Sequence, residues 1–190
     1  MSGKATSDIR TPFSKNILKK LRTGDQVKIS GTIYTARDAA HKRMYDTIEQ
    51  GGQLPFNPAG QVLFYVGPTP TPPGKVIGSA GPTTAGRMDS FAPMLIERGL
   101  RAMIGKGRRS KKVREVMLEF RCVYFGSVEG TAALLSECIR SAEIVAYEDL
   151  RSEAILRLTV EDFPAIVVND LHGGDLYEEG RNRYRRSWPG

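Results

Sequence analysis

Three basic segments of the sequence carry side chains that could bind a small anion. The first is SAGPTTAGRMD at residues 79–89, where two threonine hydroxyls and Arg87 follow small residues that let a ligand approach the backbone. The others are Arg37 and, between two glycines, Lys106. Arginine can hold a carboxylate with two parallel hydrogen bonds, and lysine acts as a compact charge. Three such cations around one site would suit a substrate with two carboxylates.

Each of the cationic segments is predicted to begin where a β-strand ends. Residues 27–34 alternate between apolar and polar, which is the period of a strand, and apolar runs at 76–78 and 102–104 precede the other two segments. Thr35 is expected to cap a helix that places Arg37 in its first turn. A cation there opposes the helix dipole, which favours an anionic partner. Because ligands of open α/β sheets bind at the carboxyl ends of strands, we expect the cations to converge at one edge.

The remaining pattern predicts an α/β fold with a parallel core and flanking helices. Strands and helices alternate with short loops, but the early strands lack helical crossovers, so part of the sheet is expected to be antiparallel or to form a second layer. We expect one domain over residues 1–190, with an arm at 1–25 and a basic tail at 178–190. Further helices are expected at 90–98, at 110–120 with Ser110 as the cap, and at 131–139; further strands are expected at 62–66, 123–125, 144–146, 155–160 and 165–168, the last two separated by a bend at Pro164.

Composition indicates a globular chain without a membrane span. Apolar residues make up 40% of the 190 residues, so the chain can bury a core. No apolar stretch approaches the ~20 residues that cross a bilayer, and residues 1–10 lack the apolar core of a signal peptide. A cytoplasmic location is therefore the expectation.

The positive net charge indicates a second class of function, which is nucleic-acid binding. The net charge of +7 and the pI near 9.5 could indicate a basic module that binds nucleic acid. Four of these charges come from Arg181, Arg183, Arg185 and Arg186 in the last ten residues. A frayed and solvated terminus accounts for such a tail better than RNA docking does, so nucleic acid is not the favoured partner.

The cysteines and histidines do not form a familiar constellation. Cys122 and Cys138 have the spacing of neither a C-x-x-C redox pair nor a zinc site, and we expect both to be small buried residues. Three or four thiolates normally hold an iron–sulfur cluster, so this chain cannot carry one alone. His41 is expected at the surface, and His172 is a weak site candidate beside Gly173.

Six segments stand in order along the chain: GTIYTARDAAHKR (31–43), VGPTP (66–70), GSAGPTTAGRMD (78–89), MIGKG (103–107), AYED (146–149) and FPAIVVND (163–170). Together they resemble motifs of the β subunit of class I fumarase. The same domain forms the β subunit of L-tartrate dehydratase and the C-terminal half of single-chain iron–sulfur fumarases. The resemblance extends from about Val27 to Tyr177, and several long motifs in the right order make it specific.

This resemblance implies a swivelling β/β/α fold with mixed sheet layers, and a hydro-lyase that reversibly adds water to fumarate to give L-malate. In the family, a [4Fe–4S] cluster with one iron not ligated by cysteine lies in the α part, where this iron acts as a Lewis acid. We therefore expect that the chain binds no metal itself, is inactive alone, and assembles with a fumarase α subunit into an oligomer. L-Tartrate dehydratase is the near alternative.

Site roles follow, residue by residue, from the matched motifs. Arg37, Arg87 and Lys106 match substrate-binding positions of the family. Thr83 matches a substrate contact that is proposed as the catalytic base. An unperturbed hydroxyl is a poor base, so Arg87 or Lys106 would have to stabilise its alkoxide. The residues expected to shape the loop are Gly81, Thr84, Gly86 and Asp89.

Overall fold

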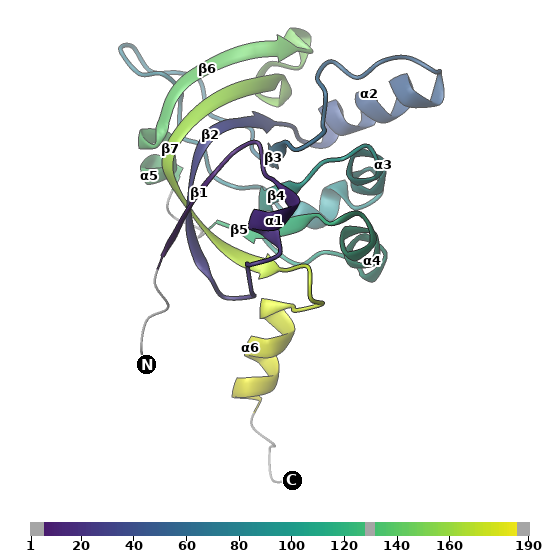
Figure 1. The fold of residues 1–190 in the computed structure, drawn as a ribbon. Helices are drawn as coiled ribbons and strands as arrows, with labels where there is room; N and C mark the ends of the chain where they lie inside the picture. The colour runs from purple at the N-terminus through teal and green to yellow at the C-terminus, as the bar shows by residue number, and fades with distance from the viewer. Residues whose placement is uncertain (1–5, 128–131, 186–190) are drawn as a thin grey trace, which may run out of the picture.

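The strands form one mixed sheet that closes on itself. The computed structural model describes residues 6–127 and 132–185. The strands are β1 (Ser7–Arg10), β2 (Gln26–Thr35), β3 (Val62–Phe64), β4 (Ala102–Gly105), β5 (Val123–Gly126), β6 (Ile139–Ala146) and β7 (Ile155–Asn169). Their order is β1-β2-β3-β4-β5-β7-β6, and β7 also pairs with β2 (Figure 1). Strands β2 to β5 and β7 therefore form a ring, with β1 and β6 outside it.

Strand direction confirms the predicted α/β class. Strands β1 to β5 run parallel to one another, whereas β7 runs antiparallel to β2, β5 and β6. The sheet is therefore mixed, with a parallel core and an antiparallel part, as the missing crossovers predicted. Because β2 to β5 are parallel, their carboxyl ends lie at one edge of the sheet.

Helices flank this sheet. They are α1 (Lys15–Leu18), α2 (Asp38–Glu49), α3 (Ala92–Glu97), α4 (Lys111–Phe120), α5 (Ala132–Glu137) and α6 (Leu176–Tyr184), together with the 3₁₀ helices η1 (Ala85–Met88) and η2 (Glu148–Glu153). Figure 1 shows α2, α3 and α4 together on one side. Ser110 caps α4 as predicted, because its hydroxyl accepts a hydrogen bond from Val113 N–H at 3.4 Å.

Alternating side chains of the central strands divide the interior into two cores. Val62 and Phe64 of β3 belong to the first core, whereas Leu63 and Tyr65 belong to the second. The second core also contains buried side chains of the flanking helices, including Met44, Leu95 and Met117. A strand buried on both faces reads as an unbroken apolar run, which is why 62–66 and 102–104 were recognisable from sequence.

Strand β7 corrects one prediction. The runs 155–160 and 165–168 were expected as two strands with a bend at Pro164, but they form a single strand. Pro164 pairs opposite Lys28 of β2, and the stretch that pairs with β6 ends at Val160. Proline lacks an N–H donor, and it is tolerated where a strand has a neighbour on one side only.

Two further predictions of local structure need correction. Residues 76–78 were predicted as a strand but lie in a loop. A Cβ atom at Gly78 would lie 2.1 Å from the carbonyl oxygen of Thr69, so this loop folds tightly on itself. The strand expected at 144–146 begins earlier, at Ile139, because α5 ends at Glu137. Residue 131 of the predicted helix lies outside the described residues.

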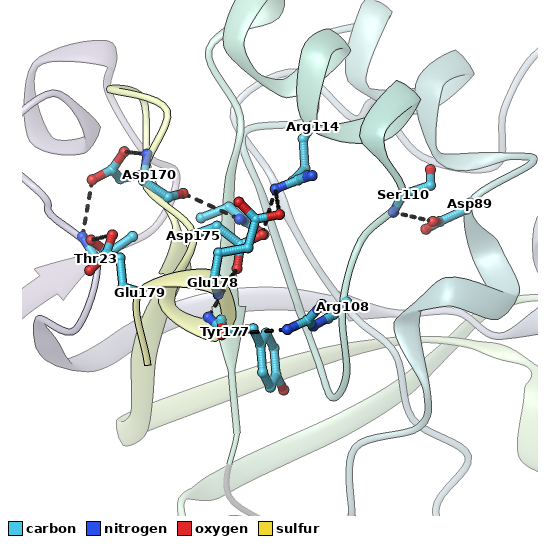
Figure 2. Close-up of polar contacts among 12 residues, drawn as sticks. Thr23, Asp89, Arg108, Ser110, Arg114, Asp170, Asp175, Tyr177, Glu178 and Glu179 are labelled. Carbon is cyan, nitrogen blue, oxygen red and sulfur yellow. Dashed lines mark hydrogen bonds and ion pairs between the residues drawn. The ribbon is translucent and has the colours of Figure 1, made fainter. Parts of the chain in front are cut away.

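The frayed terminus predicted for the last ten residues is wrong for residues 181–184, which belong to α6. Asp175 caps this helix by accepting hydrogen bonds from Tyr177 N–H and Glu178 N–H. Arg114 of α4 lies 2.6 Å from the Asp175 carboxylate and 3.0 Å from that of Glu178, which ties α6 to α4 (Figure 2). Residues 186–190 of the tail lie outside the described residues.

In the described ranges, no helix is long and apolar enough to cross a membrane. The cytoplasmic location and the division into arm, domain and tail stay predictions.

Candidate active site

The predicted anion-binding segments lie at the carboxyl ends of the parallel strands. Arg37 follows β2, Lys106 follows β4, and Ser127 follows β5. The backbone of Thr83 lies between the ends of β3 and β4. Its N–H donates to Tyr65 O at 2.7 Å, and its carbonyl accepts from Lys106 N–H at 3.1 Å. The loop therefore adjoins the sheet edge through β3, not through the expected strand at 76–78.

Arg37 and Arg87 share one carboxylate. The Nε–H of Arg87 donates to Oδ1 of Asp38 at 2.8 Å, and a terminal nitrogen of Arg37 lies 3.7 Å from Oδ2 of the same side chain. Another carboxylate, Glu153 of η2, lies 3.8 Å from Arg37. We call Arg37, Asp38 and Arg87 the arginine half of the site. Asp38 was not predicted as a site residue, although its position directly after Arg37 was a signal.

The start of α2 differs from its prediction. Arg37 is the N-cap residue and not part of the first turn, and Thr35 is the last residue of β2. Thr35 instead links two strands: its hydroxyl donates to Ala154 O at 3.3 Å and accepts from Leu156 N–H at 3.0 Å. The helix is capped from a distance, because Glu153 accepts a hydrogen bond from Ala39 N–H at 2.9 Å. A cap supplied 114 residues away in sequence cannot be found from a local pattern.

Glycine makes room for the Arg37 side chain. A Cβ atom at Gly67 would lie 2.7 Å from a terminal nitrogen of Arg37 and 3.2 Å from Ser152 O. Any larger residue would push the guanidinium away from Asp38 and Glu153. Gly67 belongs to the VGPTP motif, so this packing gives that motif a physical role at the site.

The threonine loop is held by its backbone. Thr84 occupies the N-cap position of η1 but forms no side-chain cap hydrogen bond, and it is exposed. Neither Gly81 nor Gly86 has a positive φ. A Cβ atom at Gly81 would lie 3.2 Å from that of Ala132, whereas at Gly86 it would meet only Arg108 O at 3.7 Å. Close packing therefore explains Gly81 better than Gly86.

Asp89 fastens this loop to the segment that follows Lys106. Its carboxylate lies 2.9 Å from Nε of Arg109 and accepts a hydrogen bond from Ser110 N–H at 2.6 Å. The Arg109 side chain is fully buried, with Tyr65 and Tyr124 rings 5.2 and 5.4 Å from its guanidinium carbon. Breaking a buried ion pair leaves an uncompensated charge, so Asp89 holds the loop at a fixed place.

Two tyrosines hold the turn that carries Lys106. The hydroxyl of Tyr124 donates to Gly107 O at 3.0 Å, and Gly107 N–H donates to the hydroxyl of Tyr177 at 3.1 Å. Gly107 has φ +80°, a region that favours glycine. At Gly105 a Cβ atom would lie 3.0 Å from the Tyr65 ring. Backbone conformation at Gly107 and close packing at Gly105 therefore explain why glycine occupies both positions of the MIGKG motif.

A cavity of about 610 Å³ opens beside this turn. Its lining includes Thr84, Lys106, Ser127 and Tyr177. Ser127 is 7% exposed, and its hydroxyl has no hydrogen-bond partner within the described ranges. We call Lys106, Ser127 and Tyr177 the lysine half of the site. Ser127 follows β5 as Lys106 follows β4, so the same positional rule could have found it.

Neither histidine belongs to the arginine half or to the lysine half of the site. His41 was expected at the surface, but it is fully buried against Tyr65 and Phe91, because the first turns of α2 pack on the second core. Burial lowers the pKa of His41 to about 4, so the ring is neutral near pH 7. His172 contacts Arg22 and the carbonyl of Lys19, at 3.0 Å, and not the proposed substrate-binding residues.

The side chains that the structure describes do not form a set that fits a metal cluster. Over the described residues, no group of three or more His, Cys, Asp or Glu side chains is placed to hold a metal ion. Cys122 is buried as predicted, and burial raises the pKa of its thiol to about 12, so it remains protonated. Cys138 is only partly buried, and its thiol donates to Asp162 O at 3.8 Å.

Fold and site together define an α/β protein with two cationic regions along the carboxyl edge of a mixed sheet. A family model described as "Fumarase C-terminus" matches residues 3–180. The chain therefore belongs to the Fumarase C-terminus family, which confirms the resemblance.

Curated relatives agree with this assignment. "Fumarate hydratase class I, anaerobic" of Escherichia coli is 38% identical over 181 residues, covering 93% of this chain and 33% of the relative. "Fumarate hydratase 1, mitochondrial" of Leishmania major is 40% identical over 164 residues, covering 85% and 30%. The chain thus spans about a third of the length of these relatives. A Methanocaldococcus jannaschii protein provisionally named L(+)-tartrate dehydratase subunit beta is 34% identical over 173 residues, covering 88% of this chain and 89% of the relative.

Proposed function

We propose that the chain is the β-type part of a two-subunit iron–sulfur hydro-lyase that reversibly hydrates fumarate to L-malate. The observation that carries this proposal is the pairing of Arg37 with Arg87 around Asp38, on the same sheet edge as Lys106. Family membership supplies the reaction class. In this proposal, the arginine half binds one carboxylate of the substrate and the lysine half binds the other.

Binding energy for such a substrate comes from charged hydrogen bonds. Each is worth roughly 1.5–3 kcal/mol, so a few of them support micromolar to millimolar binding after the entropic cost of association. Arg87 uses Nε for Asp38, so its two terminal nitrogens lie outside this hydrogen bond, and in this proposal they bind the substrate carboxylate. Arg37 is more enclosed, since its side chain is 22% exposed.

Thr83 is the proposed proton carrier at the substrate carbon next to the one that bears the hydroxyl group. Backbone hydrogen bonds on both sides hold its peptide, and its neighbour across one of them is Lys106. A threonine alkoxide needs a nearby cation, and in this proposal Arg87 or Lys106 supplies it. A substrate contact without proton transfer is the other role open to this hydroxyl.

We propose that the [4Fe–4S] cluster is held by a separate α-type chain, since the described side chains of this chain do not form a ligand set. In this proposal the complete enzyme forms only when the two chains assemble. Isolated chain is expected to be colourless and inactive.

L-Tartrate dehydratase is the second candidate function, and one observation favours it. The Methanocaldococcus jannaschii relative has nearly the length of this chain and is named as a subunit of that enzyme. L-Tartrate carries a second hydroxyl group, which would need one more polar partner in the site.

Anaerobic reconstitution with an α-type partner tests the proposal and separates the two substrates. Fumarate hydration that requires both chains, and that exceeds L-tartrate dehydration, is the expected result. Preferential turnover of L-tartrate would select the second candidate. Turnover of neither substrate by a well-formed, iron-loaded complex would reject both, and a brown isolated chain with bound iron would reject the division of roles.

A further inference from the structure

The Asp38 carboxylate occupies a place that helix capping does not explain. Asp38 is the first residue of α2, where an acidic side chain complements the helix dipole. However, the side chain that caps this terminus is that of Glu153, which accepts a hydrogen bond from Ala39 N–H. Asp38 instead turns toward the arginines, with Oδ1 on Arg87 and Oδ2 toward Arg37. Glu153 thus caps the helix and also lies near Arg37, whereas Asp38 lies between both arginines.

Arg87 needs a fixed partner because its own element restrains it little. It belongs to the four-residue 3₁₀ helix η1, and its side chain is 52% exposed. A long exposed side chain has many rotamers and would have to be ordered when a ligand binds. The hydrogen bond from Nε to Asp38 selects one orientation before binding, while both terminal nitrogens remain outside this bond. Such pre-organisation improves affinity without a new ligand contact.

We propose that Asp38 is a positioning residue that joins Arg37 and Arg87 into a single carboxylate receptor. This inference rests on the proposed function, because the carboxylate it serves is that of the dicarboxylate substrate. Asp38 itself does not touch the substrate. Its charge balances one arginine, so the pair of guanidiniums can lie close together without mutual repulsion.

The Asp38→Asn variant, in the reconstituted complex, tests this role. Asparagine keeps the shape of the side chain but loses the charge that holds both guanidiniums. We expect KM for fumarate to rise about tenfold while kcat changes less than threefold, because substrate binding is impaired before the chemistry. The matched control is Asp46→Asn, which removes an acid of the same helix that pairs with the exposed Lys42, away from both arginines in sequence. It should leave both constants unchanged.

A second measurement does not depend on turnover. In the full chain labelled with ¹⁵N, the Nε–H of Arg87 should exchange with water slowly in the wild type and faster in Asp38→Asn. Titration with succinate should saturate in both, with a dissociation constant about tenfold weaker in the variant. If the wild-type complex hydrates no substrate, the proposed function fails, and this titration still decides the role of Asp38. Equal succinate affinity, or tighter binding by Asp38→Asn, would overturn the inference, because Asp38 would then be neutral toward the ligand or compete with it.

Discussion

The two halves of the site hold their positive charge in different ways. In the arginine half, Arg37 and Arg87 already lie against carboxylates of the chain, Asp38 and Glu153. In the lysine half, Lys106 stands on a turn fixed by two tyrosine hydroxyls, beside a cavity of about 610 Å³. Side-chain carboxylates position the two arginines, whereas hydrogen bonds to the backbone of Gly107 position the turn that carries Lys106. The comparison teaches that a substitution can disturb the first half through its acidic side chains, and the second half through the turn.

Removing Arg87 should have the largest effect. Arg87→Ala deletes a carboxylate partner, and we expect kcat/KM of the reconstituted complex to fall about a hundredfold. The chain should unfold at an unchanged temperature, because the side chain is half exposed.

Arg140→Ala is the matched control for this prediction. Arg140 donates from Nε to Glu161 at 2.9 Å and is 57% exposed, so it resembles Arg87 in all but position. Near wild-type turnover by Arg87→Ala, or an equal loss in Arg140→Ala, would remove the arginine half from the site.

Ser127→Ala probes the lysine half. The Ser127 hydroxyl is buried at the cavity without a partner among the residues described, so we expect it to bind the substrate carboxylate near Lys106. Its loss should lower kcat/KM about tenfold without lowering the melting temperature. Ser136→Ala, which removes a hydroxyl bonded locally to Ala133 O, is the control. A drop in melting temperature with unchanged kinetics would assign Ser127 a structural role instead.

His41, which lies in α2 close to Arg37 in sequence, makes the free energy of unfolding of the chain depend on pH. Its pKa is lowered from 6.5 to about 4 by burial, so above pH 6.5 the ring is neutral in both folded and unfolded chains and this stability is fully present. As pH falls toward 4, the unfolded chain takes up a proton that the folded chain refuses. The free energy of unfolding should fall by about 2 kcal/mol between about pH 6.5 and pH 5. His41→Gln should flatten this part of the profile in urea unfolding, and an unchanged slope would contradict the assignment.

Backbone strain near Glu153 should give the smallest effect. Arg151, inside η2, has φ 52° and ψ −114°, which a side chain rarely adopts. Arg151→Gly should therefore raise the free energy of unfolding by about 1 kcal/mol. Arg121→Gly is the comparison, since Arg121 lies in the milder left-handed region with φ 63° and ψ 54°. If Arg121→Gly stabilises the chain as much as Arg151→Gly does, the backbone of Arg151 stores no more strain than an ordinary left-handed residue.

Local patterns predicted the parallel strands β2 to β5 and most helices, because neighbouring residues alone form buried runs such as 62–64 and 102–105 and the cap at Ser110. Strand β1 was missed, since residues 7–10 have no clear apolar period. The single strand β7 was missed because the tolerance of Pro164 depends on which strands lie beside it. Arg37, Arg87 and Lys106 could be named from motifs. Their roles stay predictions, but their shared sheet edge follows from the parallel strands.

Partners distant in sequence explain what the motifs could not predict. Glu153 caps α2 from 114 residues away, and the Tyr177 hydroxyl meets Gly107 from 70 residues away. The burial of His41 likewise depends on Tyr65 and Phe91. Such contacts join segments far apart in sequence, so no local period or spacing predicts them.

Inhibition constants for succinate and propionate in the reconstituted complex test most directly whether the two halves bind opposite carboxylates of one substrate. The wild type should bind succinate about a hundredfold more tightly than propionate, because only succinate engages both halves. Arg87→Ala and Lys106→Ala should each bring the succinate constant close to that of propionate. Equal constants in the wild type, or a succinate constant that neither substitution changes, would contradict the two-ended site.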